Sequence, residues 1–68
     1  MALQWEFSGS ATQTHFTVAQ AVADAMEALG VDYVSSAVVD RACEILGDGW
    51  DAKSVWAYIE NCSFEVIA

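Results

Sequence analysis

Basic residues are the scarcest feature of this sequence. Its 68 residues include only two, Arg41 and Lys53, against ten Asp and Glu, which gives a formal net charge of −8. Proteins that bind DNA, RNA or anionic membranes need lysine and arginine to neutralise phosphates. The balance therefore argues against those ligands and favours a basic protein partner. An acidic excess also keeps a small apolar protein soluble, and that alternative stays open.

Long hydrophobic runs are missing too. No apolar stretch approaches the roughly 18 residues needed to span a bilayer, and no basic-then-apolar signal segment opens the chain. We therefore expect a cytoplasmic protein that does not bind membranes. Because 56% of the residues are hydrophobic, with three Trp, three Phe and two Tyr, the chain is not of the disordered type. We expect residues 1–68 to form a single small globular domain.

Cysteine and histidine are too few for a metal site. Cys43 and Cys62 lack ligand spacing, and His15 alone cannot complete a zinc site. Two reduced thiols are favoured over a single disulfide, because disulfides belong to oxidising compartments. Any Cys–His or Ser–His nucleophile would have to use His15, which is expected in a loop. The acidic turn that begins at Asp48 has Ile59, not Glu, at the twelfth position of a calcium loop. We expect no cofactor, no metal and no enzymatic activity.

The periodicity of the chain predicts an α+β fold. Residues 2–8 and 63–67 alternate apolar and polar side chains, which is typical of half-buried strands. Two isolated strands in so short a chain are expected to pair with each other, antiparallel. We therefore predict three helices packed on a two-stranded antiparallel ribbon of the N- and C-terminal strands, in the order β-α-α-α-β. There are no prolines and no repeats.

Capping signals delimit the three predicted helices. The first is expected to follow Thr17, which has Gln20 at the capping-box position, and the others to follow Ser35 or Ser36 and Asp51. The three helices should end at about Leu29, Leu46 and Asn61, respectively, and a glycine follows each of the first two ends. Residues 31–34 could form a short strand or an extended connection. In the first helix, the predicted core face consists of Val18, Val22, Ala25 and Leu29. In the second it consists of Val38, Ala42 and Ile45, and in the third of Ala52, Val55, Trp56 and Ile59.

An acidic stripe is the leading candidate for a binding surface. Asp40, Glu44 and Asp48 recur every four residues, so they would lie about 6 Å apart along one side of a helix that reached Asp48. One DNA strand carries a charge every ~3.4 Å, so mimicry of a phosphate row would require a second row of acids. That row would come from Asp24, Glu27 and Asp32. The alternative is an ordinary solvated surface.

Aromatic residues offer a rival surface. Trp50 is expected in the turn and Tyr58 on the outer side of the last helix, where both could act as exposed anchors, while Trp56 is expected in the core. Tryptophan and tyrosine dominate binding hot spots when they are exposed. This pattern predicts a small protein-interaction module or a homodimer. The sequence does not distinguish a monomer from a dimer.

As a class, the chain resembles the small acidic proteins that phages use to disable host defence, anti-CRISPR proteins among them. The resemblance rests on length, the ten-to-two acid excess, the lack of a signal segment and the stripe of Asp40, Glu44 and Asp48. It implies a non-enzymatic inhibitor that blocks a basic, nucleic-acid-binding partner, such as a CRISPR effector complex, with DNA mimicry as one route. It also implies the cytoplasm of the host cell.

Overall fold

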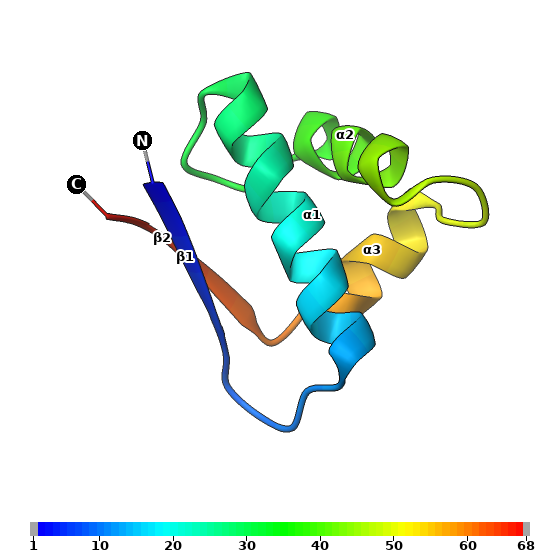
Figure 1. Cartoon of the computed structure of the whole chain (residues 1–68), viewed down its shortest axis with the longest axis horizontal. Helices are drawn as coiled ribbons and strands as arrows, with labels where there is room; N and C mark the ends of the chain where they lie inside the picture. The colour runs from blue at the N-terminus through cyan, green and yellow to red at the C-terminus, as the bar shows by residue number, and fades with distance from the viewer. Residues whose placement is uncertain (1, 68) are drawn as a thin grey trace.

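The two ends of the chain pair with each other, as predicted. The computed structural model describes residues 2–67, and its elements run in the order β-α-α-α-β of an α+β fold (Figure 1). The strands are antiparallel neighbours in a two-stranded sheet. The elements are β1 (Ala2–Phe7), α1 (Gln13–Leu29), α2 (Ser36–Leu46), α3 (Ala52–Tyr58) and β2 (Cys62–Ile67).

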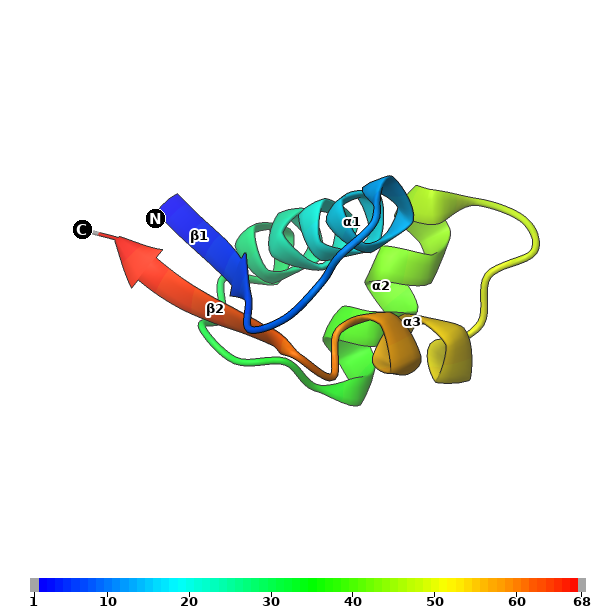
Figure 2. The same cartoon turned by 90° about the horizontal axis from the view of Figure 1, so that it is seen from below.

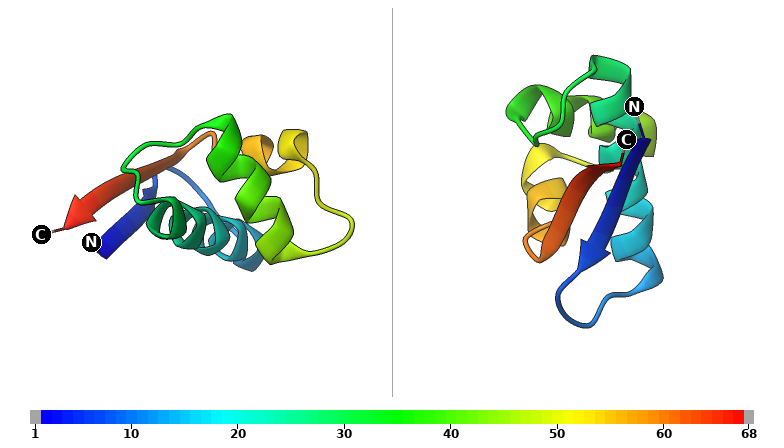
Figure 3. Two further views of the ribbon diagram at one scale, coloured as in Figure 1. Left: turned by 90° about the horizontal axis from the view of Figure 1, so that it is seen from above. Right: turned by 90° about the vertical axis from the view of Figure 1, so that its left-hand side faces the viewer.

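The register of the ribbon explains why it packs on the helices. Trp5 pairs with Phe64 and Phe7 with Cys62, whereas Gln4 pairs with Glu65 on the other face. Because side chains alternate along a strand, one face is apolar and the other is polar. The ribbon lies against one side of α1, and α2 and α3 pack on the rest of that helix (Figures 2 and 3). Helix α1 is therefore the central element of the fold.

Helix α1 begins five residues earlier than the sequence predicted. Its N-cap is Thr12, whose hydroxyl oxygen accepts the His15 N–H at 3.4 Å, while His15 Nδ1 accepts the Thr12 N–H at 3.0 Å. This is a capping box in which histidine replaces the usual Glu or Gln. Thr17 lies inside the helix, where its hydroxyl donates to the Gln13 carbonyl at 3.0 Å. The cap predicted at Thr17 and the loop predicted for His15 are both wrong.

The buried face of α1 is largely the predicted one. Val18, Val22 and Ala25 are fully buried, but Leu29 is 39% exposed and Met26 takes its place in the core. Leu29 is left outside because it is the last helical residue. The chain turns away at Gly30, whose φ of 68° is the left-handed conformation expected of a helix-ending glycine.

Helix α2 is rotated relative to the predicted packing. It starts after Ser35, whose side-chain oxygen accepts the Val38 N–H, as expected of an N-cap. Val38 and Ala42 are fully buried as predicted, but the core also takes Val39, and Ile45 is 47% exposed. The buried face is therefore centred on Val38, Val39 and Ala42, and Ile45 lies at its edge.

The segment between α1 and α2 forms no strand. Asp32 and Tyr33 form a bend, and Val31 and Val34 are partly buried against the core. Of the two structures that the sequence left open, the short strand is absent, and the residues form a connection whose valines pack on the core. Gly30 precedes this connection, and its N–H and that of Val31 bond back to helix carbonyls.

Helix α3 is shorter than predicted. It is capped by Asp51, whose Oδ1 accepts the Ser54 N–H at 2.8 Å, but it ends at Tyr58 and not at Asn61. Val55 and Ile59 are buried, whereas Trp56 is 43% exposed and Ala52 is exposed. Trp56 was expected in the core. Consecutive helical residues point about 100° apart, so Val55 and Trp56 cannot both face the core directly. Val55 lies on the inner side of this two-turn helix, and Trp56 lies on the outer side.

Candidate functional site

An open groove of about 540 Å³ runs beside the exposed side of α1. One wall is aromatic: the rings of Trp5 and Phe16 are stacked, with centroids 5.6 Å apart and planes at 28°. The other wall is aliphatic and comes from Ile45 and Leu46 at the end of α2. The volume falls within the ~300–1,000 Å³ typical of ligand sites. The groove is therefore large enough to hold part of a ligand or of a partner protein.

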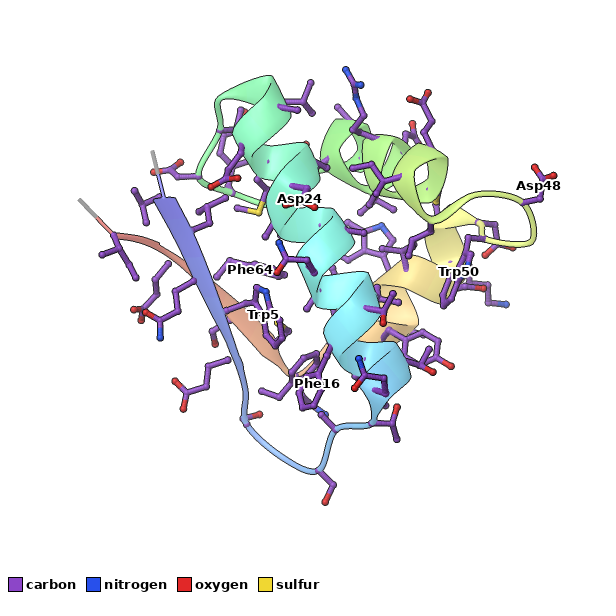
Figure 4. All side chains as sticks on the ribbon, in the orientation of Figure 1. Trp5, Phe16, Asp24, Asp48, Trp50 and Phe64 are labelled. Atoms are coloured by element: carbon purple, nitrogen blue, oxygen red, sulfur yellow. The ribbon has the colours of Figure 1, made fainter. Side chains whose placement is uncertain are left out.

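The floor of the groove is polar and belongs to α1. Gln13, Thr17, Gln20 and Asp24 follow the helical spacing of i, i+4, i+7 and i+11, so they share one line along the helix. Gln20 Nε2 donates to Asp24 Oδ1 at 2.9 Å. Asp24 carries the only charge among the residues that line the groove. Figure 4 shows Asp24 over the middle of α1, with Trp5 and Phe16 beside the helix.

The aromatic wall is held by a connected set of rings. Phe7 contacts Trp5 and Phe16 edge-on, with centroids 5.8 and 5.9 Å away. It also contacts His15, which lies 4.8 Å from the ring of Tyr58. Such pairs are worth about 0.5–1.5 kcal/mol each beyond area burial. Strand β1, helix α1 and helix α3 are thus joined at the end of α1 where the groove begins.

The predicted acidic stripe is only partly helical. Asp40 and Glu44 are exposed on α2, but the helix ends at Leu46 and Asp48 lies in the following loop. Figure 4 shows Asp48 at the tip of that loop, far from Asp24. On α2, Asp40 is about 140° around the helix from Ile45, which lines the groove. The stripe and the groove therefore lie on different sides of α2.

The three acids proposed as a second row are also exposed, but in different surroundings. Asp24 lies in the groove, Glu27 follows it on α1 outside the groove, and Asp32 lies in the connection between α1 and α2. Asp24 therefore belongs to the groove, whereas Asp40 and Glu44 do not line it.

The aromatic anchors predicted from the sequence are partly buried. Trp50 and Tyr58 pack against the core, with ring centroids 5.5 Å apart. The prediction that these two are exposed anchors is therefore wrong. Trp56, expected in the core, is the exposed tryptophan. The reason is the short α3, which directs Tyr58 toward His15 and leaves Trp56 outside.

His15 caps α1, and the two cysteines are not paired in a disulfide. His15 Nδ1 is occupied by the Thr12 cap. Burial, followed by the charges of Asp40 and Asp51, raises the pKa of the Cys43 thiol, and burial raises the pKa of Cys62. A raised pKa reduces the thiolate fraction at neutral pH, so both thiols should be less reactive than an ordinary cysteine. Within residues 2–67, no cluster of His, Cys, Asp and Glu could hold a metal ion.

The raised pKa of Cys43 makes this thiol a reporter of the acidic surface. We expect Asp40→Asn to speed alkylation of Cys43 at pH 8 by about two- to threefold, because removing a negative charge about one helical turn away lowers the pKa of the thiol and increases the thiolate fraction. The rate would be followed by mass spectrometry of peptides, which separates Cys43 from Cys62. Glu27→Gln makes the same charge change on α1 and should leave the rate unaltered. An unchanged rate in Asp40→Asn would contradict the electrostatic cause.

The residues that form the groove were not predicted as a site. The sequence predicts Trp5 in a strand, Phe16 just before the first helix, and Ile45 in the core. The exposed line on α1 from Gln13 to Asp24 was a usable signal, but the wrong helix start concealed its first turn. Only Asp24 had been named as a binding residue.

The fold and the groove define a small, acidic α+β protein with a concave surface of mixed polarity. Among residues 2–67, no helix is both long and apolar enough to cross a membrane. No protein-family model, curated protein or solved structure matches the chain.

Proposed function

We propose that this chain is an acidic, non-enzymatic binding protein that inhibits a basic, nucleic-acid-binding partner, as anti-CRISPR proteins of phages do. The observation that carries the proposal is that all ten carboxylates are exposed, against two basic side chains. Such a surface attracts a basic protein and raises the rate of encounter. A CRISPR effector complex in the cytoplasm of the host is one partner of this kind.

The spacing of the acids favours attraction over close mimicry of DNA. Asp40 and Glu44 are four helical residues apart, or about 6 Å along the axis, nearly twice the phosphate spacing of ~3.4 Å. Asp48 continues the stripe only as part of a loop. The inhibitor would therefore cover a basic surface of its partner and exclude nucleic acid from it, without reproducing the phosphate positions one by one.

The test uses charge reversal at two places with equal change in net charge. Replacing Asp40, Glu44 and Asp48 by Lys changes the formal charge from −8 to −2, and so does replacing Glu6, Glu60 and Glu65. The tagged chain would be used to isolate its partner from a host lysate at about 150 mM salt. We expect a basic nucleic-acid-binding protein, whose nucleic acid the parent chain displaces. We also expect at least tenfold weaker binding with the first variant only.

Two results would contradict this proposal. Equal binding by both triple variants would show that the stripe is not the contact surface. A captured protein that is not basic, or that retains its nucleic acid in the complex, would remove the inhibitory role.

The groove favours a second candidate function, a protein-interaction module or homodimer that uses an aromatic and apolar surface. Phe16 and Ile45 are 39% and 47% exposed in its walls. Size-exclusion chromatography at low salt and at 1 M salt separates the two candidates. Screening at 1 M reduces the Debye length to about 3 Å, so an association that survives must be apolar.

A further inference from the structure

We infer that the groove binds an extended segment of a basic protein, with an arginine paired to Asp24 and an apolar side chain packed on the stacked rings of Trp5 and Phe16. This inference rests on the proposed function and names the part of the partner that enters the groove. The groove combines a carboxylate with apolar and aromatic side chains, which the acidic stripe does not.

The carboxylate of Asp24 is placed for a cationic ligand. Its Oδ1 accepts from Gln20 Nε2, which fixes the side chain and leaves Oδ2 for another donor. The other lining side chains are uncharged, so no base of this chain competes within the groove. Arginine is favoured over lysine, because its planar guanidinium pairs with a carboxylate and also packs on aromatic rings such as Trp5.

The apolar part of the ligand would lie nearer the start of α1. There Phe16 is stacked with Trp5, and Ile45 and Leu46 line the same groove. All four side chains are at least partly accessible, so an apolar group that packs on the two rings would lose contact with water.

The length of the groove sets the spacing of the two ligand residues. From Phe16 to Asp24 is eight helical residues, which corresponds to about 12 Å along the axis. An extended peptide advances about 3.3 Å per residue, and residues four apart point to the same side. An apolar residue and an arginine four positions apart, in either order, therefore match the groove.

The experiment uses nine-residue peptides of glycine and serine that carry one leucine and one arginine four positions apart, in both orders. Matched peptides carry lysine or the neutral analogue citrulline in place of arginine, or place the leucine three positions away. Binding to the full chain would be measured by NMR titration at about 50 mM salt. We expect the indole signal of Trp5 and the methyl signals of Ile45 to shift, and those of Trp50 and Trp56 to stay.

Variants of the chain test the role of the carboxylate. Asp24→Asn keeps the size of the side chain and should weaken binding about tenfold, because it removes the charge that pairs with the guanidinium. Glu27→Gln removes the same charge from the same helix outside the groove, and binding should change less than twofold.

The inference is overturned if the two variants bind alike, if the lysine, citrulline or misplaced-leucine peptide binds as well, or if the signals that shift lie outside the groove. If the Trp5 signals shift with protein concentration in the absence of peptide, the groove binds a second copy of the chain. That result would also overturn the inference. A loss of partner binding confined to the Lys variant of Asp40, Glu44 and Asp48 would leave the proposed function intact. If that triple variant binds the partner as tightly as the parent chain, the proposed function is contradicted, whatever the result of the peptide titration.

Discussion

Replacing Met26 by alanine is expected to lower the free energy of unfolding by about 2–5 kcal/mol. Met26 is the largest fully buried side chain, and it lies on the central helix α1, which contacts the ribbon and both other helices. A domain of 68 residues has a total stability of roughly 3–10 kcal/mol, at about 0.05–0.15 kcal/mol per residue. The variant should therefore be substantially unfolded at 37 °C.

Leu29→Ala is the matched control for Met26→Ala. The sequence placed Leu29 in the core, but it is 39% exposed, so its truncation should cost less than about 1 kcal/mol. Urea unfolding followed by far-UV circular dichroism measures both free energies. A cost for Leu29→Ala equal to that of Met26→Ala would contradict the end of α1 as the structure has it.

The order of elements could be predicted because it depends on local patterns. Alternation at Leu3, Trp5 and Phe7 matches that at Phe64 and Val66, and the pairing follows because an isolated strand is unstable. Caps at Ser35 and Asp51 and the helix end at Gly30 were also predicted, since each depends on residues within one turn.

Errors arose where one pattern allowed two structures. Thr12 with His15 and Thr17 with Gln20 both resemble a capping box, but the usual pattern has Glu or Gln at the third helical position, not His. In α3, the adjacent Val55 and Trp56 could each have faced the core. Burial was decided by the tertiary arrangement, in which Tyr58 packs between His15 and Trp50.

The groove could not have been predicted from periodicity. Its walls come from β1, α1 and the end of α2, whose separations are fixed only when the ribbon and α2 pack on opposite sides of α1. The exposed acids, by contrast, could be predicted one by one, because an unpaired carboxylate is costly to bury. What the sequence could not provide was the side of the molecule on which each acid lies.

The three tryptophans allow one substitution to be compared at two positions with opposite surroundings. Trp5→Ala should lower the free energy of unfolding by about 2–3 kcal/mol, somewhat less than a fully buried aromatic. Trp5 is half-buried, stacks on Phe16, contacts Phe7 edge-on and pairs across the ribbon with Phe64. Trp56→Ala should cost less than about 1 kcal/mol, because Trp56 is 43% exposed on the outer side of α3.

Urea unfolding by circular dichroism suits this comparison, since each variant loses a fluorophore. Equal costs for the two variants would mean that the aromatic wall does not join the ribbon to α1. Trp5→Phe separates stability from recognition: it retains an aromatic ring against Phe16 and should restore most of the stability lost in Trp5→Ala. If the folded Trp5→Phe variant still binds the arginine peptides weakly, the large indole surface is itself part of the groove's recognition of its ligand.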